Sequence, residues 1–354
     1  MTRVLRYWGL ESALGAAMVS AGLLLVALWG WEWGGNDSKI THFFINVTLV
    51  VALQVFSGNS GILSFGQMAF VGTGAYVGAI LTIDPLLKPT LLTGLPHFLE
   101  TAHVSFGVAV LLAAAAGGVL AIGSGLPILR LDGASAVIAI LALLLIADVV
   151  FSAWIGVTRG AGGLYALPED TTLGRALLVA VIAVFAARWF KDSRTGLLLQ
   201  GSREDAFSAA SVGVSVRACR ARAWVLSGII SGAGGAVFAW WIGTISPTDF
   251  FLAPTFALIV MFIVGGTRTV SGAVVGAALV TLVQEKVRDY EDRSVDLKLF
   301  EIHRLTGLTQ MVLVVMILAV MYFRREGIVG RRELDESLRA VAGRLRAPAA
   351  AGRR

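Results

Sequence analysis

Cysteines, phosphate-binding lysines and grouped histidines are scarce or absent in this chain. Cys219 is the only cysteine, so one chain can form neither a disulfide nor a thiolate metal site. No lysine follows a glycine, which excludes the phosphate loop Gly-x-x-x-x-Gly-Lys-Ser/Thr. The four histidines, which show no ligand or triad spacing, are His42, His97, His103 and His303. We therefore expect no catalytic residue, no metal, no cofactor and no enzymatic activity.

Charged residues are also few. Only 15% of the 354 residues are charged and 56% are hydrophobic, whereas about a quarter of a soluble domain is charged. Apolar runs of about 17–25 residues, the length that crosses roughly 30 Å of hydrocarbon as a helix, recur along the chain. They lie at 10–31, 40–57, 62–83, 103–125, 134–156, 174–190, 223–245, 250–265, 269–285 and 306–323. The sequence predicts an all-α, polytopic membrane protein with about ten transmembrane helices, and at least eight.

The positive charges predict the orientation of these helices. If the N-terminus is inside and ten helices alternate, 20 of the 29 lysines and arginines fall in cytoplasmic segments. Six of them lie in the charged insert 191–222, and nine lie between Arg324 and the C-terminus. We expect both termini in the cytoplasm. The basic pI of about 9.8 then reflects membrane topology and contact with anionic lipid, not binding to nucleic acid.

The charge pattern also divides the chain into two parts. Residues 1–325 form a transmembrane domain that contains the insert 191–222. Residues 326–354 are rich in arginine and alanine, and we expect them to form a disordered basic tail in the cytoplasm.

Several polar side chains and glycines lie inside predicted crossings. Asp148, in LALLLIADVVFSAW, is either part of a translocation path or helix anchor, or a hydrated residue near the outer interface. Segment 58–78 holds six glycines, a density that predicts either close helix packing or a broken helix that lines a cavity. Ser64, Gln67 and Thr73 favour the path-lining alternative, although a lone amide such as Gln67 often links two helices.

A second cluster of small residues, LSGIISGAGGAVFA, lies further along the chain. Gly228 and Gly232, and Ser231 and Gly235, are four residues apart, a spacing that lets two helices approach closely. We expect Gly228, Gly232 and Gly235 to pack against neighbouring helices.

The insert contains a predicted short helix over 203–212. Ser202 is the expected N-cap, Glu204 and Asp205 fall in the first turn, and Gly213 follows the end. The alternatives are a solvated surface helix and a docking helix for a partner. We favour docking because the chain has no energy source of its own.

Five segments in chain order resemble the permeases of branched-chain amino acid ABC importers. GNSGILSFGQMAFVGTGAY at 58–76 resembles the family's first signature, and TRGAGGLYALP at 158–168 its outer-loop motif. The other three are SREDAFSAASVGVSVRACRARAWVLSGIISGAGGAVFA at 202–239, IGTISPTDF at 242–250 and IVGGTRTVSGAVVGA at 263–277. The chain is similar to the LivM-like branch, to which LivH-like and urea or amide permeases are related.

The resemblance implies a multi-pass permease subunit of the bacterial inner membrane that moves small amino acids inward. It implies two cytoplasmic ABC ATPases that bind the ATP, a second, LivH-like permease subunit, and a periplasmic or tethered substrate-binding protein. The residues on the family's ATPase-coupling pattern are Arg203, Glu204, Asp205, Ala209, Ala210 and Gly213. Two alternatives stay open: a urea or amide ABC permease, and an ion-coupled secondary transporter with Asp148 as its cation site.

Overall fold

Helices make up almost all of the described chain. The computed structural model describes residues 15–27, 37–168, 170–291, 295–297, 300–302, 307–324, 326–330 and 333. In these residues the only strands are β1 (Val295–Leu297) and β2 (Phe300–Ile302), which form a short antiparallel pair. This pair falls in the charged segment 284–305, outside the apolar runs.

Seven helical spans in the described part are long and apolar enough to cross a membrane. They comprise α2 (Asp37–Leu53) with its π-helical end η1 (Gln54–Gly58), α6 (Phe106–Ile128), α7 (Gly133–Ala153), α9 (Leu173–Asp192), α12 (Val216–Ile242), η3 (Pro247–Phe250) with α13 (Leu252–Gly265), and α14 (Val270–Glu291). Three shorter apolar helices are Gly15–Ala27, α3 (Gln67–Thr82) and α15 (Leu308–Phe323). The prediction of a polytopic all-α membrane protein is confirmed, with seven helices of full spanning length where ten were expected.

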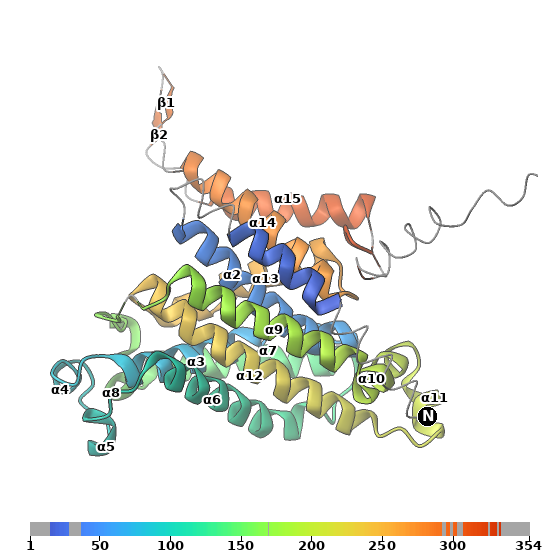
Figure 1. The fold of residues 1–354 in the computed structure, drawn as a ribbon, viewed down its shortest axis with the longest axis horizontal. Coiled ribbons are helices and arrows are strands. Elements are labelled where there is room, and N and C mark those ends of the chain that lie inside the picture. The colour runs from blue at the N-terminus through green and yellow to red at the C-terminus, as the bar shows by residue number, and fades with distance from the viewer. Residues whose placement is uncertain are drawn as a thin grey trace, which may run out of the picture.

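The helices run roughly side by side, and short elements gather at their two ends (Figure 1). One end carries α10 (Arg194–Glu204) and α11 (Ala206–Ser211), and we call it the insert end. The opposite end, which we call the far end, carries α4 (Lys88–Leu91), α5 (His97–Glu100), α8 (Ile155–Thr158), η2 (Gly160–Gly162) and the β1–β2 pair.

Helix α12 forms the centre of the bundle and packs against α6, α3 and α2. Its glycines lie at the closest approaches: a β-carbon on Gly232 would lie 2.4 Å from the Ala113 carbonyl oxygen, and one on Gly235 would lie 2.0 Å from that of Val71. On Gly228 it would lie 2.7 Å from a methyl group of α6. Only glycine fits at these three positions of α12, because neighbouring helices occupy the space that a side chain would need.

Other helices keep broad apolar surfaces exposed. Leu111 on α6, Ile138 on α7 and Val315 on α15 are each more than 60% exposed. Exposed apolar residues on helices of spanning length are typical of surfaces that face lipid. The bundle is thus tightly packed around α12 and apolar on its outside.

Part of the predicted basic tail returns to the bundle. The backbone N–H groups of Ile328 and Val329 donate to the carbonyls of Val264 and Gly265 at the end of α13. Residues 334–354, for which we predicted disorder, lie outside the described residues, so that part of the prediction stays a prediction.

Candidate coupling surface and intramembrane polar residues

The insert forms two short helices where the sequence predicted one. Ser193 caps α10 by accepting a hydrogen bond from Gly196, and Asp205 caps α11 by accepting from Phe207 and Ser208. The prediction of one helix over 203–212 capped by Ser202 is therefore wrong, because Asp205 has an extended backbone that ends α10. The side chain of an aspartate can accept hydrogen bonds from the backbone N–H groups that follow it, and in this way it caps the start of a new helix.

Asp205 is fixed in this role as a charged group. Its carboxylate also accepts from the Ser208 hydroxyl, and these hydrogen bonds hold the pKa of Asp205 below its ordinary value. The aspartate thus stays ionised as the N-cap of α11.

Arg203 connects the insert to the glycine-rich segment far away in sequence. Its guanidinium donates to the carbonyl of Gly58 at 2.6 Å. Gly61, which has a positive φ of 76°, lies against the stem of the same side chain, so that a β-carbon there would lie 2.8 Å from it. The end of α10 is therefore bound to the connection between α2 and α3.

Glu204 connects the insert to a second element. Its carboxylate lies 2.9 Å from the guanidinium of Arg268, in the connection between α13 and α14. The Glu204 side chain is 65% exposed, so this ion pair contributes little stability, on the order of 0–1 kcal/mol. Its geometric effect is to hold α10 beside that connection.

Helix α11 has no buried residue and projects from the insert end. Phe207 is 84% exposed and Val212 is 80% exposed, and Ala209 and Ala210 lie beside them with Ala209 partly covered. Gly213 ends this surface with a φ of 83°, a conformation that favours glycine. The sequence analysis missed Phe207 and Val212, whose signal was a large apolar side chain in an otherwise charged insert.

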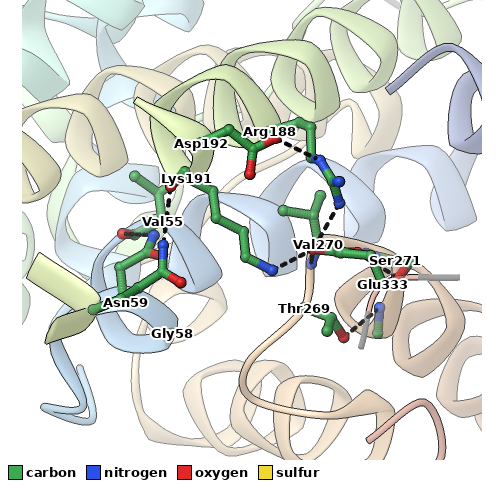
Figure 2. Close-up of polar contacts among 12 residues, drawn as sticks. Val55, Gly58, Asn59, Arg188, Lys191, Asp192, Thr269, Val270, Ser271 and Glu333 are labelled. Atoms are coloured by element: carbon green, nitrogen blue, oxygen red, sulfur yellow. Dashed lines mark hydrogen bonds and ion pairs between the residues drawn. The ribbon is translucent and has the colours of Figure 1, made fainter. Parts of the chain in front are cut away.

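A buried carboxylate from the tail binds the insert end (Figure 2). Glu333 lies 3.0 Å from Arg188 and also pairs with Lys191, and it accepts hydrogen bonds from the N–H groups of Val270 and Ser271. Burial would raise the pKa of Glu333, but the charges of Lys191 and Arg188 outweigh burial and lower it to about 2. We call these five residues the Glu333 cluster, and it joins α9 to the start of α14.

The sequence analysis missed Glu333 and Arg188 as structural residues. Glu333 stands in the tail that we expected to be disordered, and Arg188 ends a predicted crossing, so neither position carried a signal of burial. Only the return of the tail to the bundle brings them together.

Gln67 and Ser64 are fully buried where α2 meets α3. The Gln67 amide donates to Ser227 at 2.9 Å and to Ser231, both on α12, so it links two helices. The Ser64 hydroxyl has no hydrogen-bond partner among the described residues, and neither has the buried amide of Gln54. Unpaired polar atoms therefore gather beside the π-helical end of α2, a type of irregularity frequent at functional sites.

Thr73 and Asp148 lie nearer the far end. Thr73 is partly buried and its hydroxyl donates to the Ala69 carbonyl within α3. Asp148 is partly buried and has no hydrogen-bond or ion-pair partner in the described part of the chain. It lies near Tyr76, whose hydroxyl is buried and has no hydrogen-bond partner among the described residues. Of the four predicted path residues, Ser64 precedes α3, Gln67 and Thr73 lie on α3, and Asp148 lies on α7.

Comparison with known sequences assigns the family. Residues 37–321 match the family described as "Branched-chain amino acid transport system / permease component". The chain belongs to this family of transport permeases. The match covers every described helix from α2 to α14 and nearly all of α15, so the matched region includes both the insert and the intramembrane polar residues.

Two relatives of this chain carry the name "High-affinity branched-chain amino acid transport system permease protein LivM". The protein of Escherichia coli strain K12 is 26% identical over 324 residues, which cover 80% of this chain and 72% of the relative. That of Salmonella typhimurium strain LT2 is 25% identical over 309 residues, which cover 77% and 68%. No solved structure matches this chain. The resemblance to LivM-like permeases is thereby confirmed.

Proposed function

We propose that this protein is a permease subunit of an ABC importer that moves branched-chain amino acids into a bacterial cell. The observation that carries the proposal is the exposed helix α11, found in a member of this permease family. It directly follows α10, whose Arg203 bonds to the glycine-rich segment. The names of the relatives support the substrate class, because both refer to branched-chain amino acids.

The topology we propose has ten crossings, both termini in the cytoplasm and the insert end on the cytoplasmic side of the inner membrane. The concentration of arginine at the insert end supports this orientation. The contacts of residues 326–330 and Glu333 support it too, since they bring the start of the basic tail to the same end as the insert.

Two cytoplasmic ATPases would supply the energy, and α11 would bind one of them. Phe207 and Val212 suit an apolar groove on the partner, and Ala209 and Ala210 allow close approach. Exposed apolar side chains grouped on one element are typical of interaction sites. A LivH-like second permease would complete the membrane part, and a periplasmic or tethered binding protein would deliver the amino acid at the far end.

Two contacts would transmit the movement of the ATPases. The Arg203 to Gly58 hydrogen bond acts on the end of α2, and the Glu204 to Arg268 ion pair acts on the connection of α13 to α14. The unpaired amide of Gln54 and hydroxyl of Ser64 lie beside the first of these contacts. A conformation in which they face a water-filled path would satisfy both groups.

The path itself would follow α3. Ser64, Gln67, Thr73 and Asp148 remain our proposed lining residues, and the bonds of Gln67 to α12 give it a second role in holding α3 to that helix. Asp148 would lie on the route near the far end.

The deciding experiment is uptake by proteoliposomes that contain this chain and the products of the neighbouring genes. We expect uptake of labelled leucine only when ATP and the binding protein are both present. Uptake by this chain alone, driven by an ion gradient, would overturn the importer and favour a secondary transporter that uses Asp148.

Association with the ATPases can be tested separately. We expect Glu204→Lys with Asp205→Lys to abolish copurification of the ATPases while the chain still inserts into the membrane. Unchanged copurification would show that the insert does not bind the ATPases.

A further inference from the structure

A cavity of about 350 Å³ opens at the far end, within this single chain. Its walls come from α2, α3, α12, η3, α13, α14 and α15, and none of the four proposed path residues lines it. Small-molecule pockets measure about 300–1,000 Å³, so this cavity suits a metabolite and is too small for a lipid with two long chains.

The cavity changes from charged to apolar with depth. Glu285, Arg288 and Glu291 line its mouth from one face of α14, at the spacing of successive helical turns. The inner wall is apolar and buried, and it consists of Leu49, Met68, Val71 and Met261. A ligand with charges at one end and an apolar group at the other would match both parts.

Arg288 is the group at the mouth that suits an anion. It is exposed and has no ion-pair partner among the described side chains. Glu285, in contrast, lies 3.5 Å from Lys39 and 3.4 Å from His42. Glu291 accepts hydrogen bonds from Thr309. A guanidinium with no partner among the described side chains, beside two glutamates of the same helix that are already engaged, is well suited to bind a carboxylate in bidentate fashion.

Asp249 is the group that suits a cation. Its Oδ2 atom accepts hydrogen bonds from the backbone and hydroxyl of Ser246 at 2.7 and 2.8 Å. No donor among the described residues reaches Oδ1. This carboxylate is therefore held in place by one oxygen while the other stays available to an ammonium group.

We propose that this cavity binds a zwitterionic amino acid with an apolar side chain. Arg288 binds its carboxylate, Asp249 binds its ammonium group, and the side chain lies against Met68 and Met261. The inference rests on the proposed function and adds a substrate site on the permease itself. Urea fits poorly, because it has neither a net charge at each end nor an apolar group to place on the inner wall.

Protection of an introduced cysteine tests the site. In a Cys219→Ser background, Ala257→Cys places a thiol in the cavity wall, and Leu86→Cys places one on an exposed loop at the same end. The assembled transporter is treated with a membrane-impermeant thiol reagent, with and without L-leucine. We expect leucine to slow labelling at position 257 at least fivefold and to leave position 86 unchanged.

Two leucine analogues and two variants of the protein test how the charged groups of leucine are bound. Isoamylamine lacks the carboxylate of leucine and 4-methylpentanoate lacks its ammonium group, so both should protect at least tenfold less well. Arg288→Gln should raise the leucine concentration for half protection about tenfold or more. Lys286→Gln, a neighbouring charge that does not line the cavity, should leave it unchanged.

The outcomes separate this inference from the proposed function. ATP-dependent leucine uptake without protection of position 257, or equal protection by isoamylamine, would overturn the site and leave the importer intact. Protection without ATP-dependent uptake would support the site and overturn the importer.

Discussion

The guanidinium of Arg203 donates a hydrogen bond to the carbonyl of Gly58, 145 residues away in sequence and 2.6 Å away in space. This bond joins the last turn of α10 to the π-helical end of α2. Because it is made to a charged donor, its loss costs about 1.5–3 kcal/mol. It connects the exposed insert directly to the interior of the bundle.

The first prediction concerns this bond. Arg203→Gln should leave ATP hydrolysis by the assembled importer nearly unchanged and lower leucine uptake at least fivefold, because the movement of α10 no longer reaches α2. The measurement is the ratio of amino acid transported to ATP hydrolysed in proteoliposomes. Arg222→Gln removes an exposed arginine of the same region whose one hydrogen bond among the described residues is to Thr195, and it should keep the wild-type ratio. Equal ratios in all three proteins would contradict the coupling role of Arg203.

The second prediction concerns the exposed surface of α11. Phe207→Asp should reduce copurification of the ATPases at least tenfold, since a charge replaces the apolar side chain expected to enter the partner. Phe207 contributes nothing to the core of this chain, so thermal stability of the isolated permease should not change. Leu86→Asp alters an equally exposed residue at the far end and serves as the control. Normal copurification of the Phe207 variant would place the contact elsewhere.

The third prediction concerns the packing of α12. Gly232→Val should destabilise the fold by more than the usual 1–3 kcal/mol of overpacking, because the added atoms meet backbone of α6 that cannot move aside. Gly123→Val, on α6, meets no atom within 4 Å and should unfold near the wild-type temperature. Thermal unfolding in detergent, followed by size-exclusion chromatography, measures both. Similar midpoints for the two variants would exclude a packing role for Gly232.

The fourth prediction concerns the Glu333 cluster and pH. The pKa of Glu333 is lowered from 4.5 to about 2, so its contribution to stability is complete above about pH 4.5 and is lost as the pH falls toward 2. A difference of this size corresponds to about 3 kcal/mol. Glu333→Gln should therefore lower the unfolding temperature at pH 7, and the gap to the wild type should narrow below pH 4.5.

The control for this series is Glu204→Gln, which removes an exposed carboxylate whose ion pair with Arg268 contributes little stability. Its unfolding temperature should follow the wild type at every pH. A gap for Glu333→Gln that stays constant from pH 7 to pH 3 would show that the carboxylate is not held ionised by Arg188 and Lys191.

Local properties of the sequence determined much of this protein. Long apolar runs fixed the helices, because a chain in lipid must satisfy its backbone hydrogen bonds within each segment. The four-residue spacing of Gly228 and Gly232 indicated a face without side chains, and the Arg203 to Gly213 pattern carried the family resemblance. Each of these signals lies within a few turns of one helix, where residue type and spacing are sufficient.

Contacts between distant segments were decided only by the tertiary structure. The break at Asp205, the bond from Arg203 to Gly58 and the burial of Glu333 each depend on which elements lie beside one another. The far-end cavity likewise combines side chains of α2, α13 and α14 that share no local pattern. Such contacts form because helices pack in the arrangement that fills space around α12, and no single stretch of sequence records that arrangement.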